Sequence, residues 1–394
     1  MEYAYALIDR GYVPDMVLRP VIRRLCRNRQ REIDHGSLEA NHAAKLSFIS
    51  DLHHQPIAVH QDKANEQHYE IPTSFLRLCL GPRMKYSSCF WPTPTCSLVD
   101  AEDAILSLYC QEARLGLGLR GVGKPQTVNS VGPISSELSS VAHEKEKGVV
   151  GDAELRSWEK MGGIGKEGEG LKILDMGCGW GSLGLFFAEH YPLAEITMLS
   201  NSRTQKEYID SIILDKGYEK VEVITGDVAT YEFSPSQFTH ILSIELLEHL
   251  RSYPLLFTKI STWLQPHGIL YIHIFCHRTQ PYLFLQKDGW MAQTFFTGGC
   301  MPSFDLFLYF QKQFTILDSK WMNGRQYSRT LEAWLKNQDK FQKDGLEILR
   351  KEMGCEEGEK TFWRFRVFFM ACSEFFGMDQ GETWGVGRYL FEKK

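Results

Sequence analysis

A short apolar run followed by closely spaced glycines is the strongest constraint on the fold of this 394-residue chain. Residues 173–181 read ILDMGCGWG, with glycines at 177, 179 and 181. Such a segment is typical of a buried parallel strand that turns tightly into a helix, here predicted over 182–190. Glycines at the turn let a ligand approach the backbone, and the amino end of the helix carries partial positive charge. The sequence therefore predicts a site for a nucleotide-type cofactor.

The spacing of the glycines separates two kinds of cofactor. A dinucleotide-binding fold uses G-x-G-x-x-G, which would require a glycine at position 182, where the chain has Ser182. The spacing present is G-x-G-x-G, the form usual in methyltransferases that bind S-adenosylmethionine (SAM). A strand-to-helix turn with purely structural glycines remains the alternative at this point.

Composition limits the class of protein. Apolar residues make up 43% of the chain, enough to bury a sizeable core, and the net charge of −5 argues against a nucleic-acid-binding surface. None of the ten cysteines forms a C-x-x-C pair, and no H-E-x-x-H motif occurs. No apolar run approaches the roughly 20 residues of a membrane span. We therefore expect a cytoplasmic protein with free thiols, no metal site and no transmembrane segment.

From Leu171 onward, strand and helix patterns alternate, which predicts an α/β fold with helices on both faces of a parallel-rich, seven-stranded sheet. The predicted strands are 171–175, 195–199, 220–224, 239–243, 268–275, 314–322 and 385–391. The predicted helices are 181–190, 203–217, 245–264, 330–353 and 362–376. A helical excursion is predicted over about 279–312, after the fifth strand.

The chain before this core, which we place at 168–394, divides into two parts. Residues 1–120 show helical periodicity and are interpreted as a lid that caps the cofactor and the substrate. Within them, the arginine-rich stretch 17–31 is interpreted as a solvated helix face, with binding to an anionic membrane or substrate as the alternative. Residues 121–167 are rich in Gly, Ser, Lys and Glu and predict a flexible insertion.

Polar residues follow the first three predicted strands, at the sheet edge where ligands bind in doubly wound folds. After the second strand, a hydroxyl and amides replace the acid that often binds a ribose there. After the third, an aspartate would accept the adenine amino proton, and a plain turn aspartate is the alternative. The residues expected to line the cofactor site are Asp175, Gly177, Gly179, Gly181, Ser200, Asn201, Gln205, Asp227 and Val228.

After the fourth strand, the segment SIELLEHLRSY predicts a helix. Glu245 and His249, at i and i+4, would share one of its faces, with Glu248 beside them. An amine is protonated at neutral pH and cannot attack a methyl donor until it loses a proton, which a Glu–His pair could remove. The alternative is an acid that stabilises the helix dipole. His273 on the fifth strand would point from the same sheet edge, with a core histidine as its alternative.

Taken together, the sequence segments of this chain resemble the cyclopropane-fatty-acid-synthase-like methyltransferases. Within that superfamily, they are most similar to the coclaurine N-methyltransferase branch. The resemblance spans nearly the whole chain except 121–167. It implies a Rossmann-like class I fold with SAM as the cofactor. Among the segments that carry it are NEQHYEIPTSF (65–75), LGPRMKYSSCFW (80–91), ILDMGCGWGSLGLFFAEHYP (173–192), IELLEHL (244–250), IHIFCHRT (272–279) and NGRQYSRTLEAW (323–334).

The resemblance also implies roles for individual residues. Tyr86 and Ser87 occupy the K-Y-S positions that help to hold the methionyl part of SAM. Alkaloid N-methyltransferases use the acid and the histidine that correspond to Glu245 and His249, with Glu248 nearby. Cyclopropane synthases instead bind bicarbonate as the base. The four positions that would hold it are here Ser88, Glu248, His273 and Tyr327.

Two departures from the lipid enzymes favour amine methylation. Ser88 stands where those enzymes have a cysteine, and Glu245 stands where they tend to have a small residue. We therefore predict N-methylation of a small, largely apolar amine. Two alternatives stay open: methyl or methylene transfer to an unsaturated acyl chain, and a SAM-binding protein without catalysis. The sequence does not decide the oligomeric state, and a homodimer is among the states left open.

Overall fold

The computed structural model describes residues 2–58, 71–115, 168–285, 290–295 and 298–394. The predicted insertion over 121–167 lies outside these residues, as do the domain boundaries drawn on either side of it. No helix in the described ranges is both long and apolar enough to cross a membrane.

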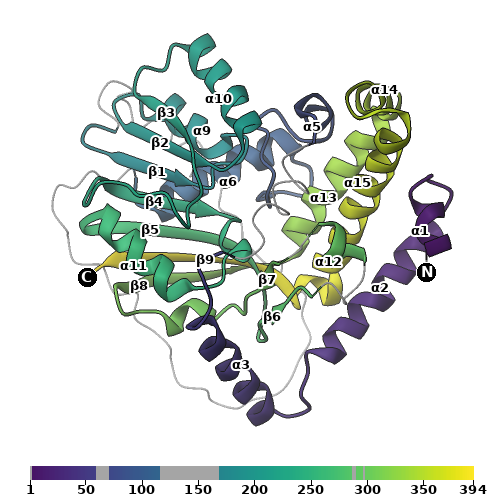
Figure 1. Cartoon of the computed structure of the whole chain (residues 1–394), viewed down its shortest axis with the longest axis horizontal. Helices are drawn as coiled ribbons and strands as arrows, with labels where there is room; N and C mark the ends of the chain where they lie inside the picture. Colours follow the sequence, from purple (N-terminus) through teal and green to yellow (C-terminus); the bar gives the residue numbers. More distant parts are fainter. Residues whose placement is uncertain (1, 59–70, 116–167, 286–289, 296–297) are drawn as a thin grey trace, which may run out of the picture.

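A seven-stranded sheet forms the centre of the molecule (Figure 1). Its order is β3-β2-β1-β4-β5-β9-β8, in which β1 to β5 are parallel and β9 is antiparallel to both of its neighbours. This confirms the predicted parallel-rich sheet, and all seven predicted strands are present. The strands are β1 (Lys172–Met176), β2 (Glu195–Ser200), β3 (Val221–Thr225), β4 (Phe238–Ile244), β5 (Leu264–His277), β8 (Phe314–Met322) and β9 (Trp384–Lys393).

The central strands β1, β4 and β5 are buried on both faces, and successive side chains of a strand point to opposite sides. On β5, Tyr271 and Phe275 join one apolar cluster, which includes residues of α6 (Leu98–Glu112) and α15 (Cys355–Phe376). Leu270 and Ile272 join the other, which includes residues of α11 (Tyr253–Trp263). Helices α9 (Ser182–His190) and α10 (Arg203–Lys216) complete the first two crossovers between parallel strands.

The predicted helix over 245–264 is wrong in its first half. A short 3-10 turn, η1 (Leu247–His249), follows β4, and α11 begins only at Tyr253. Pro254 occupies the first turn of α11, where its missing N–H costs nothing. Glu245 has a φ of 49° and donates its backbone N–H to the carbonyl of His273, so it extends the sheet edge and cannot begin a helix.

Two other helical predictions are modified. The predicted helix over 330–353 is two helices, α13 (Arg325–Lys340) and α14 (Gln342–Met353), which meet at Phe341. The excursion after β5 contains helical turns in α12 (Trp290–Thr294) and η3 (Leu306–Tyr309), but also a two-stranded sheet of β6 (Tyr282–Leu283) and β7 (Cys300–Met301).

Ion pairs attach the N-terminal helix α2 (Asp15–Glu32) to the rest of the chain. It runs along α15 (Figure 1). Arg19 contacts Glu332 at 2.7 Å and Glu374 at 3.0 Å, and Arg23 contacts Glu374 at 3.0 Å. Arg19 and Arg23 therefore form ion pairs within the protein. The sequence analysis expected the arginine-rich stretch either to face solvent or to bind an anionic membrane or substrate. Among the residues that the structure describes, this part also contains the helices α1 (Glu2–Ile8), α3 (Leu38–Leu52) and α5 (Thr73–Cys79).

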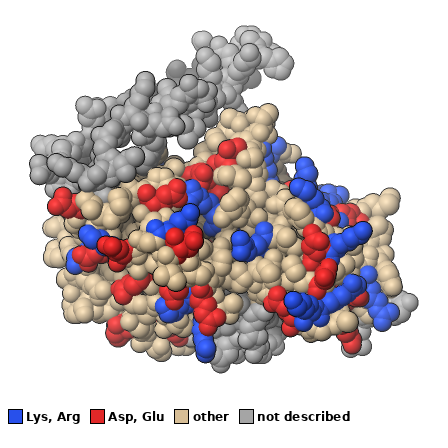
Figure 2. Space-filling model, turned by 90° about the horizontal axis from the view of Figure 1, so that it is seen from above, with Lys and Arg blue, Asp and Glu red and all other residues tan. Residues whose placement is uncertain are grey.

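The charged surface is mixed. Figure 2 shows acidic and basic side chains interspersed over the visible face of the molecule. Such a surface agrees with the small net charge of the chain.

Gly324, at the start of α13, packs directly against backbone. An added Cβ would overlap the carbonyl oxygens of Trp384 and Phe376, which cannot move without disturbing β9 and α15. We expect Gly324→Ala to lower the free energy of unfolding by about 3 kcal/mol, measured by chemical denaturation. Lys336→Ala, at an exposed position of the same helix, is the control and should change it by less than about 0.5 kcal/mol. Equal stability of the two variants would contradict this packing.

Candidate active site

The glycine loop after β1 has the conformation that its sequence predicts. Gly177, Gly179 and Gly181 have φ angles of 80°, 53° and 79°, in the left-handed region that favours glycine. A Cβ at Gly177 would come within 2.9 Å of Leu246, and one at Gly181 within 2.8 Å of Ile209. A Cβ at Gly179 would meet no atom within 4 Å. The middle of the loop therefore has open space on the side where a ligand could approach.

Asp175 lies beneath this loop and stabilises its connection to α9. It is 1% exposed, and its Oδ2 accepts the backbone N–H of Gly184 at 3.0 Å. Burial raises the pKa of the Asp175 carboxyl to about 7. Asp175 thus supports the glycine loop from the end of β1.

The end of β2 supplies a hydroxyl–amide pair. The Ser200 hydroxyl donates to Oε1 of Gln205 at 2.7 Å, which orients the amide. Nε2 of Gln205 is buried and has no hydrogen-bond partner in the described structure. An amide donor held in this way fits a cofactor oxygen such as a ribose hydroxyl, because a buried donor without a partner is costly. Asn201, also predicted for this site, is exposed.

The end of β3 lies beside the end of β2, since Ser200 is paired with Thr225. There, Oδ1 of Asp227 accepts the backbone N–H of Ala229 at 2.7 Å. This hydrogen bond is typical of a turn aspartate, which was the alternative interpretation of this residue. Val228 is buried and supplies an apolar surface next to it. The ends of β1, β2 and β3 thus bring the predicted cofactor residues to one edge of the sheet.

Glu245 is the centre of a second group, at the end of β4. Its Oε2 accepts the Tyr327 hydroxyl at 2.6 Å. Its Oε1 is 3.1 Å from Nε2 of His273 and accepts the backbone N–H of Ser88 at 3.3 Å. The Glu245 side chain is only 7% exposed. Three donors from different parts of the chain therefore hold this buried carboxylate in one orientation.

Glu248 and His249 lie in η1, so the predicted i,i+4 relation between Glu245 and His249 on one helix face is wrong. Glu248 is buried, and burial together with the nearby Glu245 raises the pKa of its carboxyl well above the usual range. The structure groups Glu245 with His273 and Tyr327, which are distant in sequence.

Lys85, the first residue of the K-Y-S segment, holds this segment in place, and the sequence analysis did not single it out. Lys85 is buried and donates to the Ser87 hydroxyl and, at 2.8 Å, to the carbonyl of Ser88. Burial lowers the pKa of the Lys85 ammonium group. The ring of Tyr86 stacks on Trp334, with the ring centroids 5.7 Å apart. Lys85 thereby fixes the backbone that delivers the Ser88 N–H to Glu245.

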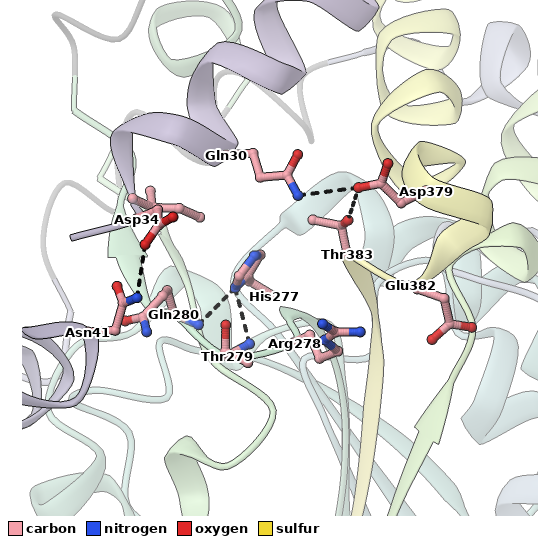
Figure 3. Close-up of a pocket in the computed structure, with 11 residues that line it drawn as sticks. Gln30, Asp34, Asn41, His277, Arg278, Thr279, Gln280, Asp379, Glu382 and Thr383 are labelled. Atoms are coloured by element: carbon pink, nitrogen blue, oxygen red, sulfur yellow. Dashed lines mark hydrogen bonds between the residues drawn. The ribbon is translucent and has the colours of Figure 1, made fainter. Parts of the chain in front are cut away.

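A polar cavity of about 330 Å³ lies outside both groups, between the end of β5 and helices α2 and α3 (Figure 3). His277 projects into it, and Nδ1 of this ring accepts the backbone N–H groups of Thr279 and Gln280 at 3.1 and 2.8 Å. The carboxylates that line the cavity, among them Asp34 and Asp379, are exposed to solvent. None of the predicted site residues lines this cavity.

The open side of the glycine loop leads to a test of cofactor binding. We expect Gly179→Ala to raise the dissociation constant for SAM at least about tenfold, a loss of about 1.4 kcal/mol, because the new methyl group would occupy the ligand's space. Gly217→Ala is a matched control: Gly217 has a φ of 67° and likewise no atom near an added Cβ, but it caps α10. Calorimetric titration should show normal binding by the control. Equal affinities of the two variants would contradict the assignment.

Comparisons with known proteins show the family of this chain. The sequence model of the family described as mycolic acid cyclopropane synthetase matches residues 144–384, more than half of the chain. The (S)-coclaurine N-methyltransferase of Thalictrum flavum subsp. glaucum is 28% identical over 98% of this chain and 94% of its own.

Solved structures that are similar to this chain include the following two. A coclaurine N-methyltransferase bound to N-methylheliamine and SAH superposes with a TM-score of 0.83, at 28% identity and 99% coverage of both chains. The cyclopropane synthase MmaA2 from Mycobacterium tuberculosis shares the fold, with a TM-score of 0.63 at 18% identity over 86% of this chain and all of that one. The chain belongs to the mycolic acid cyclopropane synthetase family and is a SAM-dependent methyltransferase.

Proposed function

We propose that this protein transfers the methyl group of SAM to the nitrogen of a small, largely apolar amine. The observation that carries the proposal is the buried carboxylate of Glu245, which three donors hold at the end of β4. The relatives named as coclaurine N-methyltransferases support the same reaction class.

The residues that would hold SAM lie along the ends of β1, β2 and β3. The glycine loop would accommodate its methionyl part together with Tyr86 and Ser87, and Ser200 and Gln205 would bind the ribose. Asp227 and Val228 would contact the adenine. When bound, SAM supplies a methyl group on a positively charged sulfur.

Glu245 would act on the amine. Its carboxylate binds the ammonium form of the substrate, accepts one N–H proton and so frees the lone pair for an in-line attack. His273 and Tyr327 keep the carboxylate in place by donating to its two oxygens. Glu248 and His249 lie directly after it and remain predicted participants in proton transfer.

The main alternative is transfer to an unsaturated acyl chain with bicarbonate as the base, which membership of the family supports. Three of the positions implied for bicarbonate are Ser88, His273 and Tyr327. Here the Ser88 N–H and the His273 and Tyr327 side chains all face the Glu245 carboxylate. The protein's own carboxylate therefore occupies the donors that bicarbonate would need, which favours the amine.

We also propose that residues 1–120 form the lid, because this part contributes the Ser88 N–H and helix α6 to the Glu245 group. The excursion over about 279–312 would supply further walls of the substrate site. A cytoplasmic location is supported by the ten cysteines, all of which are free.

The test is a turnover assay that measures release of S-adenosylhomocysteine. Secondary and tertiary cyclic amines and arylalkylamines form one panel, and unsaturated phospholipid with and without bicarbonate forms the other. We expect turnover on amines, with a mass gain of one methyl group. Glu245→Gln should lower kcat at least about 100-fold, because the amide cannot accept the proton, and should leave the SAM dissociation constant unchanged.

Glu195→Gln is the matched control, since Glu195 is exposed at the opposite end of the parallel strands. It should keep the full kcat. Bicarbonate-dependent turnover on lipid, with Glu245→Gln as active as the unmodified enzyme, would instead establish the acyl-chain reaction.

A further inference from the structure

We propose that Tyr109 is a positioning residue, whose hydroxyl fixes the tautomer of His273 so that Nε2–H is donated to Glu245. This inference rests on the function proposed for Glu245. Nothing in the sequence pattern pointed to Tyr109, which is 164 residues from its partner in the chain.

Two hydrogen bonds connect three buried side chains in series. The Tyr109 hydroxyl on α6 is 3.0 Å from Nδ1 of His273, and Nε2 of the same ring is 3.1 Å from Oε1 of Glu245. Tyr109 and His273 are both 0% exposed. Their rings meet edge to face, with the centroids 5.2 Å apart and an interplanar angle of 82°. Water therefore does not compete for either ring nitrogen of His273.

The direction of each hydrogen bond follows from the charges. Burial lowers the pKa of His273 to about 4 and raises the pKa of the Tyr109 hydroxyl well above its usual value, so both groups are neutral at pH 7. A neutral imidazole has one N–H and one acceptor nitrogen. Since an ionised carboxylate only accepts, a charged Glu245 favours the hydrogen on Nε2, and the Tyr109 hydroxyl adds to this preference by donating to Nδ1.

The opposite tautomer is disfavoured by the same contacts. It would place the lone pair of Nε2 against the Glu245 carboxylate. It would also turn Tyr109 into an acceptor, and the described structure offers the Tyr109 hydroxyl no second partner to which it could donate. Tyr109 therefore stabilises the one arrangement in which His273 supports the charge of Glu245.

Loss of the hydroxyl should act through His273. The substitution Tyr109→Phe keeps the aromatic ring, whose centroid lies 5.3 Å from Nζ of Lys85. Nδ1 of His273 then lacks its donor, and the two tautomers approach each other in energy. Glu245 is held less firmly in the orientation that accepts the substrate proton, so kcat falls while SAM binding persists.

A neighbouring tyrosine provides a matched control. Tyr271 is also buried, and its ring lies 5.7 Å from that of Tyr109. Its hydroxyl donates to Oε2 of Glu112 at 2.7 Å, outside the Glu245 group. Glu112 keeps Arg388 and Lys320 as partners when that hydroxyl is removed. Tyr271→Phe thus deletes an equivalent buried hydroxyl without touching His273.

The kinetic arm compares the two variants on the best acceptor found for the unmodified enzyme. We expect Tyr109→Phe to lower kcat about tenfold or more, as the loss of a histidine's orienting partner commonly does, with an unchanged SAM dissociation constant. Tyr271→Phe should keep kcat within about twofold. A normal kcat in Tyr109→Phe, or an equal loss in both variants, would overturn the proposal.

The spectroscopic arm needs no turnover. Nitrogen NMR of protein labelled with ¹⁵N-histidine, with the His273 signals identified by their loss in His273→Asn, reports which ring nitrogen carries the hydrogen. We expect a single Nε2–H tautomer in the unmodified protein and in Tyr271→Phe, and a mixture in Tyr109→Phe. An unchanged tautomer in Tyr109→Phe refutes the role of Tyr109. Failure of Glu245→Gln to affect amine turnover refutes the proposed function separately.

Discussion

A buried negative charge needs donors from its surroundings, and in this protein that requirement joins distant parts of the chain. Glu245 accepts hydrogen bonds from Ser88, His273 and Tyr327, which are 157, 28 and 82 residues away from it in sequence. These partners belong to the segment before α6, to β5 and to α13. Each must be in place before the carboxylate is satisfied. The active group therefore forms only when the N-terminal part, the sheet and the C-terminal helices have packed together.

The backbone accommodates this charge at a cost. Glu245 has a positive φ, an unfavourable conformation for a residue with a side chain, and it occurs where the chain leaves β4. The N–H of Glu245 bonds to the carbonyl of His273, so the main chain and the side chain of Glu245 both contact the same residue of β5. The strain at this position is offset by contacts that a regular helix start would not allow.

The sequence predicted the sheet well because the strands are apolar runs bounded by turn residues, and tertiary packing agrees with that pattern. It failed at 245–264, where Glu, Leu and His favour a helix locally but the bond to β5 and Pro254 delay the helix until Tyr253. The glycine loop could be predicted from spacing alone, since its three left-handed glycines lie within five consecutive residues, 177–181. The family resemblance grouped Ser88, His273 and Tyr327 as positions for bicarbonate, but no pattern in the sequence assigned them to Glu245, because a spacing rule such as i,i+4 describes neighbours on one helix. Lys85 and Tyr109 were missed for the same reason.

The order of the strands has a consequence for biosynthesis. β9 lies between β5 and β8, although it is the last of the seven strands to be synthesised. Until β9 is inserted, β5 exposes one edge with unpaired backbone groups, and β8 has no partner in the sheet. Open edges of this kind can pair with other chains and promote aggregation. Translation must therefore proceed through β9 before the strand that carries His273 is enclosed, and chaperones would be most needed during that interval.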